Sequence, residues 1–232
     1  MIIRTVVFVI FFAVTAFAQD YLILLHGLGR TNKSMRALEE RLVKENYEVL
    51  NLDYASRSGT IPFISDSLIA PEIESFYSDT SKKINFVTHS LGGIVVRYYL
   101  NRHSLPNLGR IVMLSPPNKG SEVVDFLTQF PLVPDIMGPA FLQLAADSNS
   151  FVNNLPAIQA EIGIITGKSS INFINSVLIP GPDDGKVSVE SAVLEGMSDF
   201  YVVNRTHPFI MSAPEVLDQV VSFLQNGYFN KE

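Results

Sequence analysis

Cysteine is absent from the sequence, and positive charge is scarce. Without cysteine the chain has no disulfide, no thiol nucleophile, no cysteine metal site and no lipidated N-terminal cysteine. The net charge of −6 argues against a nucleic-acid-binding surface. Repeats, low-complexity segments and interdomain linkers are absent as well. With 47% hydrophobic and 17% charged residues among its 232 positions, the chain is expected to form one globular domain with a sizeable core.

The first 18 residues have the pattern of a secretory signal peptide. Arg4 precedes an apolar run, Val6–Val14, and Ala16–Ala18 fits the small-x-small rule for cleavage. The apolar run is well short of the roughly 20 residues that a membrane-spanning helix needs, which disfavours the alternative of an uncleaved anchor. We therefore expect cleavage after Ala18 and a mature domain over 19–232. A secreted or periplasmic location is expected, since export without cysteine is more natural in a bacterial envelope.

Short apolar runs alternate with segments of helical spacing along the rest of the chain. Apolar runs bounded by turn residues are typical of strands that are buried on both faces of a sheet. The alternation predicts an α/β fold, a mostly parallel sheet of about six strands with helices on both faces. The expected strands are Tyr21–Leu25, Val49–Asp53, Ile84–Val87, Arg110–Leu114, Glu161–Gly167 and Asp199–Val203.

Local signals predict several helix boundaries. Thr31–Asn32 supplies candidate caps for the helix after the first strand. A second helix is expected from about Ser65 to Thr80, with Pro71 kinking or restarting it. Ser212–Glu215 has the form of a capping box for the last helix, which Gly227 is expected to end.

The turn after the third expected strand carries the strongest functional signal. Ser90 lies there between a strand and a helical segment, in the run Thr88-His89-Ser90-Leu91-Gly92. A serine on a sharp strand-to-helix turn has an exposed hydroxyl, and the Leu91 N–H points to where an oxyanion would form. Gly92 has no Cβ, so the helix can start close to the strand. The alternative is that Ser90 only caps the helix.

These residues resemble the nucleophile elbow of the α/β-hydrolase superfamily, in its lipase branch, with Thr88 in place of the first glycine of G-x-S-x-G. The resemblance implies an α/β-hydrolase fold over nearly the whole mature chain and a Ser-His-Asp triad with Ser90 as the nucleophile. Asn118–Ser121, which follows Ser115-Pro116-Pro117, also resembles lipase-type hydrolases, including the family that deacylates glycosylphosphatidylinositol anchors.

In this fold the acid and then the histidine follow the serine along the chain. His26 and His89 precede Ser90, and His103 lies on the elbow helix, so His207 is the expected base.

The acid is expected in the loop Pro180–Ser191, whose proline and glycine content disfavours regular structure. Asp184 is the assignment, because the run Asp-Gly-Lys-Val that it begins matches the Asp-Gly-x-Val setting of the acid in bacterial lipases. Asp183 stays open as an alternative, and Glu190 is a third candidate.

The run His26-Gly27-Leu28-Gly29, after the first strand, has the H-G-x-G form of the oxyanion loop in this superfamily. The resemblance places the Leu28 N–H opposite that of Leu91. His26 is expected to order the loop through hydrogen bonds, and His89 is expected to pack beside the serine. Neither histidine is assigned a proton-transfer role.

The sequence thus predicts a secreted serine esterase of lipase type that forms an acyl-enzyme and needs no metal or other cofactor. The segment of about 116–160 is apolar and broken by prolines, so it is a candidate cap over an acyl site, with completion of the core as the alternative. The expected partner is a small-molecule or lipid ester, with transient contact to a lipid surface and no nucleic acid, and a monomer is the default. An acyltransferase using the same triad and a non-catalytic envelope binding protein remain alternatives.

Overall fold

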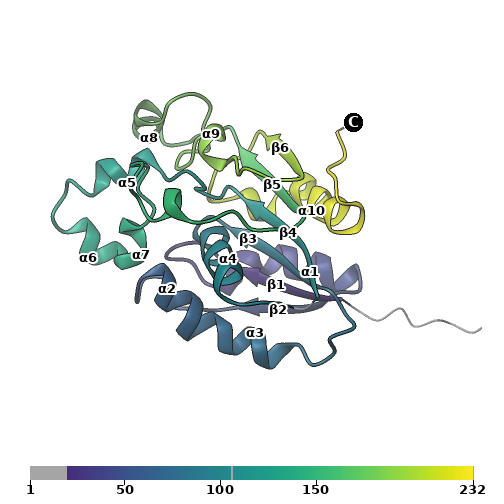
Figure 1. Ribbon diagram of the computed structural model, residues 1–232. Helices are drawn as coiled ribbons and strands as arrows, with labels where there is room; N and C mark the ends of the chain where they lie inside the picture. The colour runs from purple at the N-terminus through teal and green to yellow at the C-terminus, as the bar shows by residue number, and fades with distance from the viewer. Residues whose placement is uncertain (1–19, 106, 232) are drawn as a thin grey trace, which may run out of the picture.

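One parallel sheet of six strands forms the centre of the computed structural model, which describes residues 20–105 and 107–231 (Figure 1). The predicted signal peptide over 1–18 lies outside the described residues. The strand order is β2-β1-β3-β4-β5-β6, and every neighbouring pair is parallel. The strands are β1 (Tyr21–Leu25), β2 (Glu48–Leu52), β3 (Ile84–His89), β4 (Leu108–Leu114), β5 (Ile162–Gly167) and β6 (Asp199–Val203).

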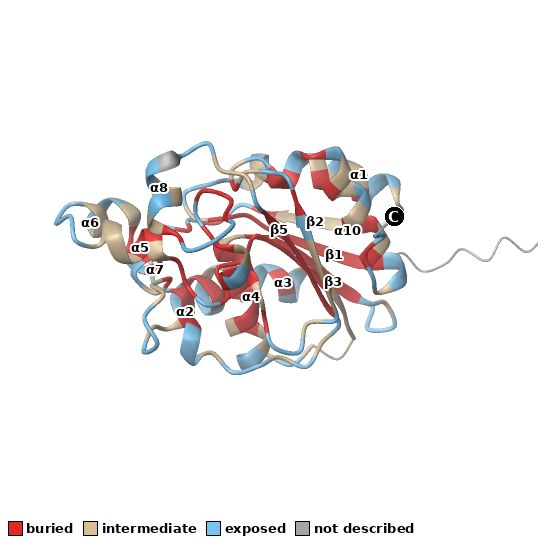
Figure 2. Cartoon of the chain, turned by 90° about the horizontal axis from the view of Figure 1, so that it is seen from above, coloured by how far each residue is buried: buried red, intermediate tan, exposed pale blue. Residues whose placement is uncertain are grey.

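Helices cover both faces of this sheet, as the alternating sequence pattern predicts (Figure 2). Leu22 and Leu24 of β1 pack with α1 (Arg36–Lys44) and α10 (Pro214–Asn226) on one face. Ile23 and Leu25 point to the other face, because successive side chains of a strand alternate. The second layer contains α2 (Ile61–Phe63), α3 (Ala70–Phe76) and α4 (Leu91–Arg102). The predicted α/β-hydrolase arrangement is therefore confirmed.

The chain between β4 and β5 forms short helices and no strand of the sheet. They form a lobe beside the sheet (Figure 1), and its buried side chains, such as Val124 and Phe141, belong to the core cluster on one face of the sheet. These helices are α5 (Glu122–Leu127), α6 (Val133–Met137), α7 (Pro139–Leu142) and the 3₁₀ turn Val152–Asn154. Further short elements lie later in the chain and near the first helix: α8 (Phe173–Leu178), α9 (Val189–Ala192), and 3₁₀ turns at Asn32–Met35 and Ile210–Ser212.

The helix predicted over 65–80 starts and ends earlier, at Ile61 and Phe76. The Thr60 hydroxyl accepts the Phe63 N–H and caps its start. Its middle, Ile64–Ile69, has π-helical geometry, and Pro71 lies in the first turn of the α-helix that follows. Proline lacks the N–H that an interior helical position needs, so the helix restarts at this point.

The predicted capping box at the start of α10 is wrong. Ala213 is the N-cap and makes no side-chain hydrogen bond. The Ser212 hydroxyl donates to the Phe209 carbonyl instead, and Glu215 forms an ion pair with Arg205 over 2.6 Å. The charged partner outcompetes a backbone N–H for the glutamate. Gly227 ends α10 with φ of 83°, as predicted.

The predicted caps at Thr31 and Asn32 also fail. Neither side chain caps the helix, and the Asn32 N–H donates to Asp53 Oδ1 over 3.3 Å. The acceptor therefore comes from the end of β2, which is distant in sequence. Among the described residues, no helix is both long enough and apolar enough to span a membrane.

Candidate active site

The parallel strands place the predicted site loops together at one edge of the sheet, because their carboxyl ends lie on the same side. Ser90 follows β3 directly and has φ of 53° and ψ of −122°, a backbone conformation that costs a non-glycine residue roughly 1–3 kcal/mol. The Ser90 N–H donates to the Leu114 carbonyl over 2.9 Å, which helps to hold this turn. A Cβ at Gly92 would lie 2.6 Å from the Leu25 carbonyl oxygen, so only glycine lets α4 start this close to β1.

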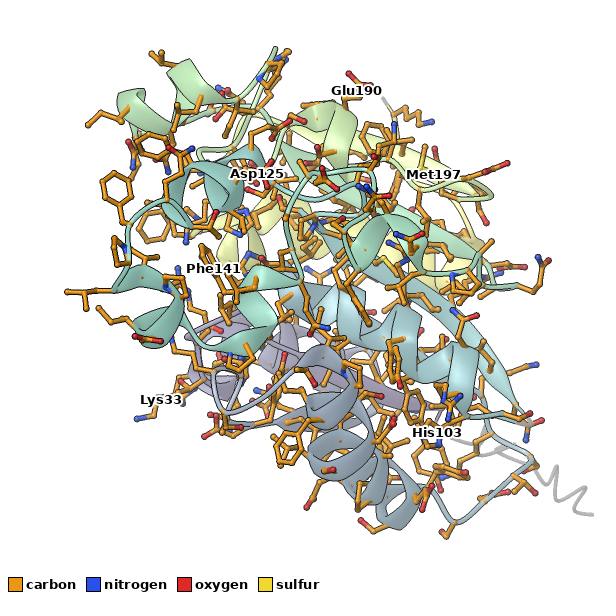
Figure 3. The ribbon with its side chains drawn as sticks, turned by 60° about the vertical axis from the view of Figure 1, so that its left-hand side comes forward. Lys33, His103, Asp125, Phe141, Glu190 and Met197 are labelled. Atoms are coloured by element: carbon orange, nitrogen blue, oxygen red, sulfur yellow. The ribbon has the colours of Figure 1, made fainter. Side chains whose placement is uncertain are left out.

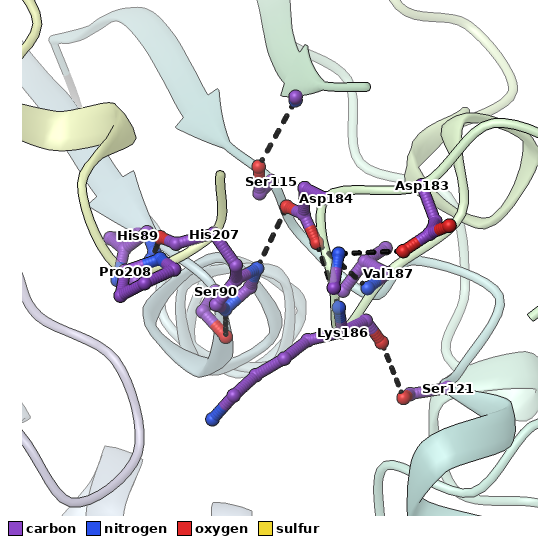
Figure 4. A network of polar contacts seen from close by, with 12 residues as sticks. His89, Ser90, Ser115, Ser121, Asp183, Asp184, Lys186, Val187, His207 and Pro208 are labelled. Atoms are coloured by element: carbon purple, nitrogen blue, oxygen red, sulfur yellow. Dashed lines mark hydrogen bonds and ion pairs between the residues drawn. The ribbon is translucent and has the colours of Figure 1, made fainter. Parts of the chain in front are cut away.

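Ser90, His207 and Asp184 form one chain of hydrogen bonds (Figure 4). Ser90 Oγ lies 3.0 Å from His207 Nε2, and His207 Nδ1 lies 2.8 Å from Asp184 Oδ2. His207 and Asp184 are buried, while Ser90 is partly accessible. With its proton on Nδ1, the imidazole has its other nitrogen free to accept the serine proton.

Hydrogen bonds to its own loop and to His207 fix the position of Asp184. Its Oδ1 accepts the N–H groups of Lys186 and Val187 over 3.0 and 2.9 Å, and its carbonyl accepts the His207 N–H over 2.9 Å. Gly185 has φ of 96°, which a residue with a side chain rarely adopts. Burial raises the pKa of Asp184, but interactions with His207, Ser115 and Val187 together bring that pKa below its ordinary value. The carboxylate is therefore ionised at neutral pH.

The two other candidate acids lie apart from His207. Asp183 Oδ1 accepts the Gly185 N–H and the Ser176 hydroxyl over 2.7 and 3.0 Å. The Glu190 side chain is 86% exposed and approaches Lys119 to 3.9 Å. Of the three acids considered from the sequence, only Asp184 contacts His207.

The two predicted oxyanion donors are the backbone N–H groups of Leu28, in the loop after β1, and of Leu91, the residue after Ser90. Leu91 is the first residue of α4, where a backbone N–H has no acceptor within the helix. Leu28 lies in the turn after β1, and within the described part of the chain no protein group accepts its N–H. Both N–H groups therefore remain available for a developing negative charge.

His26 orders the loop that carries Leu28. Its Nδ1 lies 2.9 Å from the Gly27 carbonyl, its Nε2 accepts the Tyr54 N–H over 3.3 Å, and its ring stacks on Tyr54 at 4.1 Å. Burial lowers the pKa of His26, so the ring is neutral in this position. The Gly29 N–H donates to Ser56 Oγ and fixes the far side of the loop.

His89 packs beside the triad and supports the segment of His207. Its Nε2 lies 3.1 Å from the His207 carbonyl, and the two rings are 4.8 Å apart. Burial, with the nearby His207 and Arg30 adding to it, lowers the pKa of His89 well below its ordinary value. A neutral His89 places no competing positive charge beside the base.

Ser115 is a site residue that the sequence reasoning missed. It follows β4 with φ of 46°, and its hydroxyl accepts the Gly167 N–H over 3.4 Å. It is also one of the groups that lower the pKa of Asp184. Its position at the end of a strand of the parallel sheet is the signal that could have identified it.

A cavity of about 130 Å³ opens in front of Ser90. The lobe between β4 and β5 supplies most of its apolar wall, and Phe141 of α7 lies on the inner side of this lobe (Figure 3). The apolar residues of the lobe that line the cavity are Val123, Val124, Leu127, Met137, Phe141 and Leu144. Among the described residues, no group of three His, Asp or Glu side chains could hold a metal ion.

Arg97 ties the returning end of this lobe to α4. The guanidinium is buried and donates to the carbonyls of Asn118, Val152 and Leu155 over 3.0–3.4 Å. Burial lowers the pKa of Arg97 to about 10, so it stays protonated at neutral pH. At the other end, the Ser121 hydroxyl donates to the Lys186 carbonyl over 2.7 Å.

Several solved structures share this fold. Lipase BlEst2 of Bacillus licheniformis, in its mature form, has a TM-score of 0.72 at 17% identity over 89% of this chain and 92% of that chain. The Pyrococcus furiosus esterase PF2001 has a TM-score of 0.61 at 21% identity over 89% and 82% of the two chains. Phospholipase PlaB of Legionella pneumophila has a TM-score of 0.64 at 15% identity, over 91% of this chain and 60% of that one. At these identities the similarity shows the fold, that of the α/β-hydrolases.

The match to a protein family covers a shorter part of the chain than these structural matches do. Residues 18–128 match the family described as "Putative serine esterase (DUF676)". The matched segment includes Leu28, Ser90 and Leu91, whereas Asp184 and His207 lie beyond it. The predicted resemblance to serine esterases is thereby confirmed over somewhat less than half of the chain, and the solved structures confirm the α/β-hydrolase fold. No curated protein matches the chain by sequence.

Proposed function

We propose that this protein cleaves carboxylic acyl esters, with lipid acyl esters as its substrate class, through an acyl-enzyme formed on Ser90. The unbroken hydrogen-bond chain from Ser90 through His207 to Asp184, at the mouth of an apolar cavity, carries the proposal. The match to a serine esterase family supports the same class of reaction.

In the first half-reaction Ser90 Oγ attacks the ester carbonyl carbon while His207 Nε2 takes the serine proton. The N–H groups of Leu28 and Leu91 stabilise the oxyanion of the tetrahedral intermediate. The C–O bond to the alcohol then breaks, and the imidazolium returns its proton to the leaving oxygen. The buried Asp184 carboxylate holds the ring and stabilises its positive charge.

In the second half-reaction a water molecule takes the place of the alcohol. His207 accepts a proton from this water, whose oxygen attacks the acyl carbonyl carbon. The bond to Ser90 Oγ breaks, and the proton passes from His207 back to the serine. Because the acyl group is transferred to water, the overall reaction is a hydrolysis.

Activity-based labelling tests the central assignment. A fluorophosphonate probe should label the wild type and lose that labelling in Ser90→Ala and His207→Ala, since the nucleophile needs its base. Ser222→Ala, on the outer side of α10, is the matched control and should label as the wild type does. If the probe does not label the wild type, the proposal fails and the alternative of a non-catalytic binding protein on a hydrolase fold is favoured.

The cavity supports a preference for acyl chains longer than acetyl. A cavity of about 150 Å³ holds a benzene molecule, so the space before Ser90 suits roughly six carbon atoms without movement of the lobe. Each buried methylene contributes up to about 0.8 kcal/mol, which gives up to about 10²-fold in kcat/KM from acetyl to hexanoyl esters. A steady fall of kcat/KM along that series would reject lipid esters and leave a small-ester esterase.

Contact with a lipid surface is part of the proposal. Large apolar side chains are exposed on α6 and α8 or beside them, including Leu132, Ile136, Ile174 and Val177. Both helices also reach the cavity, through Met137 and Asn175. Leu132→Ser with Ile136→Ser should slow hydrolysis of emulsified lipid more than hydrolysis of a dissolved ester, and equal losses would argue against this contact.

Secretion or periplasmic location also remains a proposal. It is supported by the sequence pattern of the first 18 residues. N-terminal sequencing of the exported protein should find Gln19 as its first residue, whereas Met1 on a membrane-bound form would indicate an anchor.

A further inference from the structure

Three basic side chains gather around the mouth of the cavity. Arg30 and Lys186 line the cavity together with Ser90 and His207. Arg30 also lines the adjoining surface groove with Arg57. These residues come from the loops after β1, β2 and β5, so the fold and not a local motif brings them together.

Both arginines act on Lys186. Although Lys186 is partly open to solvent, desolvation by its surroundings and then the charge of Arg30 lower its pKa, with Arg57 adding a smaller effect against the attraction of Asp184. A Cβ at Gly29 would lie 2.4 Å from Arg57 Nη2, so the Arg57 guanidinium lies against the oxyanion loop.

No carboxylate neutralises this group. Over the described ranges, none of the three has an acidic side chain within 4.0 Å. Asp184, which attracts Lys186, is hydrogen-bonded to His207, and Asp53, which lines the groove with Arg30 and Arg57, accepts the Asn32 N–H. Arg36, Arg41, Arg110 and Arg205 are each paired with a carboxylate. Arg30, Arg57 and Lys186 are exposed and lack such a pair, as Arg102 and Lys44 do, but Arg30 and Lys186 are the ones that line the cavity.

A chain with a net charge of −6 thus places two cations without a carboxylate partner, Arg30 and Lys186, on the wall of the cavity that contains Ser90. The repulsion destabilises the folded protein slightly, and an anionic ligand would relieve it. The apolar wall comes from α5–α7, whereas the cations come from other loops, so the site can accommodate an apolar chain and a charged group at once.

We propose that Arg30, Arg57 and Lys186 determine specificity by binding a negatively charged group on the alcohol portion of the ester. The inference depends on the proposed ester hydrolysis and narrows its substrate to anionic acyl esters. A guanidinium presents a planar fork of donors that suits phosphate or carboxylate oxygens, and the ammonium adds a compact charge.

Two matched substrates test this inference. Dihexanoylphosphatidylglycerol and 1,2-dihexanoylglycerol carry the same acyl chains, and both are used as monomers, so surface binding plays no part. The kcat/KM for the anionic lipid should exceed that for the neutral one. This ratio should fall by about threefold to tenfold in Arg30→Gln and in Lys186→Gln, since each loses a charged donor. Raising salt from about 0.05 M to about 0.5 M should also lower the ratio.

Lys44→Gln removes the same charge from the exposed end of α1 and should keep the wild-type ratio. Both substrates are measured on one preparation, so a partly unfolded variant lowers both rates and leaves the ratio unchanged. A wild-type ratio near one, or a ratio that Arg30→Gln and Lys186→Gln both preserve, would overturn the inference while ester hydrolysis stands. Failure to cleave either lipid or any simple ester, with no probe labelling, would overturn the proposed function as well.

Discussion

Replacing Asp184 by asparagine probes the triad through the direction of one hydrogen bond. Asp184 Oδ1 accepts two backbone N–H groups, from Lys186 and Val187. An asparagine at this position must keep its oxygen toward those donors, which turns its NH₂ group toward His207 Nδ1. The imidazole then carries its proton on Nε2, facing Ser90, and cannot accept the serine proton.

The expected loss is about 10⁴-fold in kcat, or about 5.5 kcal/mol of transition-state stabilisation. Asp183→Asn is the matched control, because it makes the same chemical change one residue away. Its remaining oxygen still accepts the Gly185 N–H and the Ser176 hydroxyl, so kcat should stay within about threefold of wild type.

The assay is kcat for a soluble ester at pH 7, measured on purified variants whose folding is verified by circular dichroism. Asp184→Asn should remain folded, since the asparagine can keep the two backbone hydrogen bonds of Oδ1. A larger loss for Asp183→Asn than for Asp184→Asn would refute the reasoning and transfer the role to Asp183.

Gly27→Ala should lower kcat by about tenfold or more, because its methyl would lie 2.9 Å from His89 Nδ1 and 3.1 Å from Ser90 Cβ; unchanged steady-state kinetics would show that the site can relax. Arg97→Met should lower the free energy of unfolding in urea by about 3 kcal/mol, since buried carbonyls lose a charged donor; an equally stable variant would contradict this. Burial lowers the pKa of both His26 and His89, so the unfolded chain, whose histidines titrate near 6.5, binds more protons below neutral pH. The free energy of unfolding should therefore fall from pH 7 to pH 5, by up to about 1.4 kcal/mol per pH unit for each histidine, and a flat profile would argue against both shifts.

The strands and the order of the site loops could be predicted because each depends on a short local pattern. A strand such as β1, buried on both faces, is apolar throughout and stands out from its neighbours. The strand-turn-helix context singles out Ser90, and chain order then leaves His207 as the base. The Asp-Gly-x-Val run made Asp184 a candidate, but only the structure shows that its side chain is hydrogen-bonded to His207.

The features that escaped prediction depend on contacts outside the short local patterns on which the predictions rest. Glu215 does not complete a capping box because Arg205, from the loop after β6, binds it. The π-helical turn of Ile64–Ile69 has no sequence signal that we recognise, although Ile64 and Ile69 are buried in the core. The cation group of Arg30 and Lys186 joins loops separated by most of the chain, so no window of the sequence contains it.

The lobe that lines the cavity is attached to the domain at both ends and in its middle, where the Ala140 N–H donates to the Gly59 carbonyl over 3.0 Å. The Ser121 hydroxyl holds its start, and the Arg97 guanidinium holds its end at Val152 and Leu155. Phe141 lies between the two ends and lines the cavity, but it takes no part in the hydrogen bonds that join Ser90, His207 and Asp184. A smaller side chain at Phe141 would therefore widen the cavity while the hydrogen bonds that join Ser90, His207 and Asp184 stay in place.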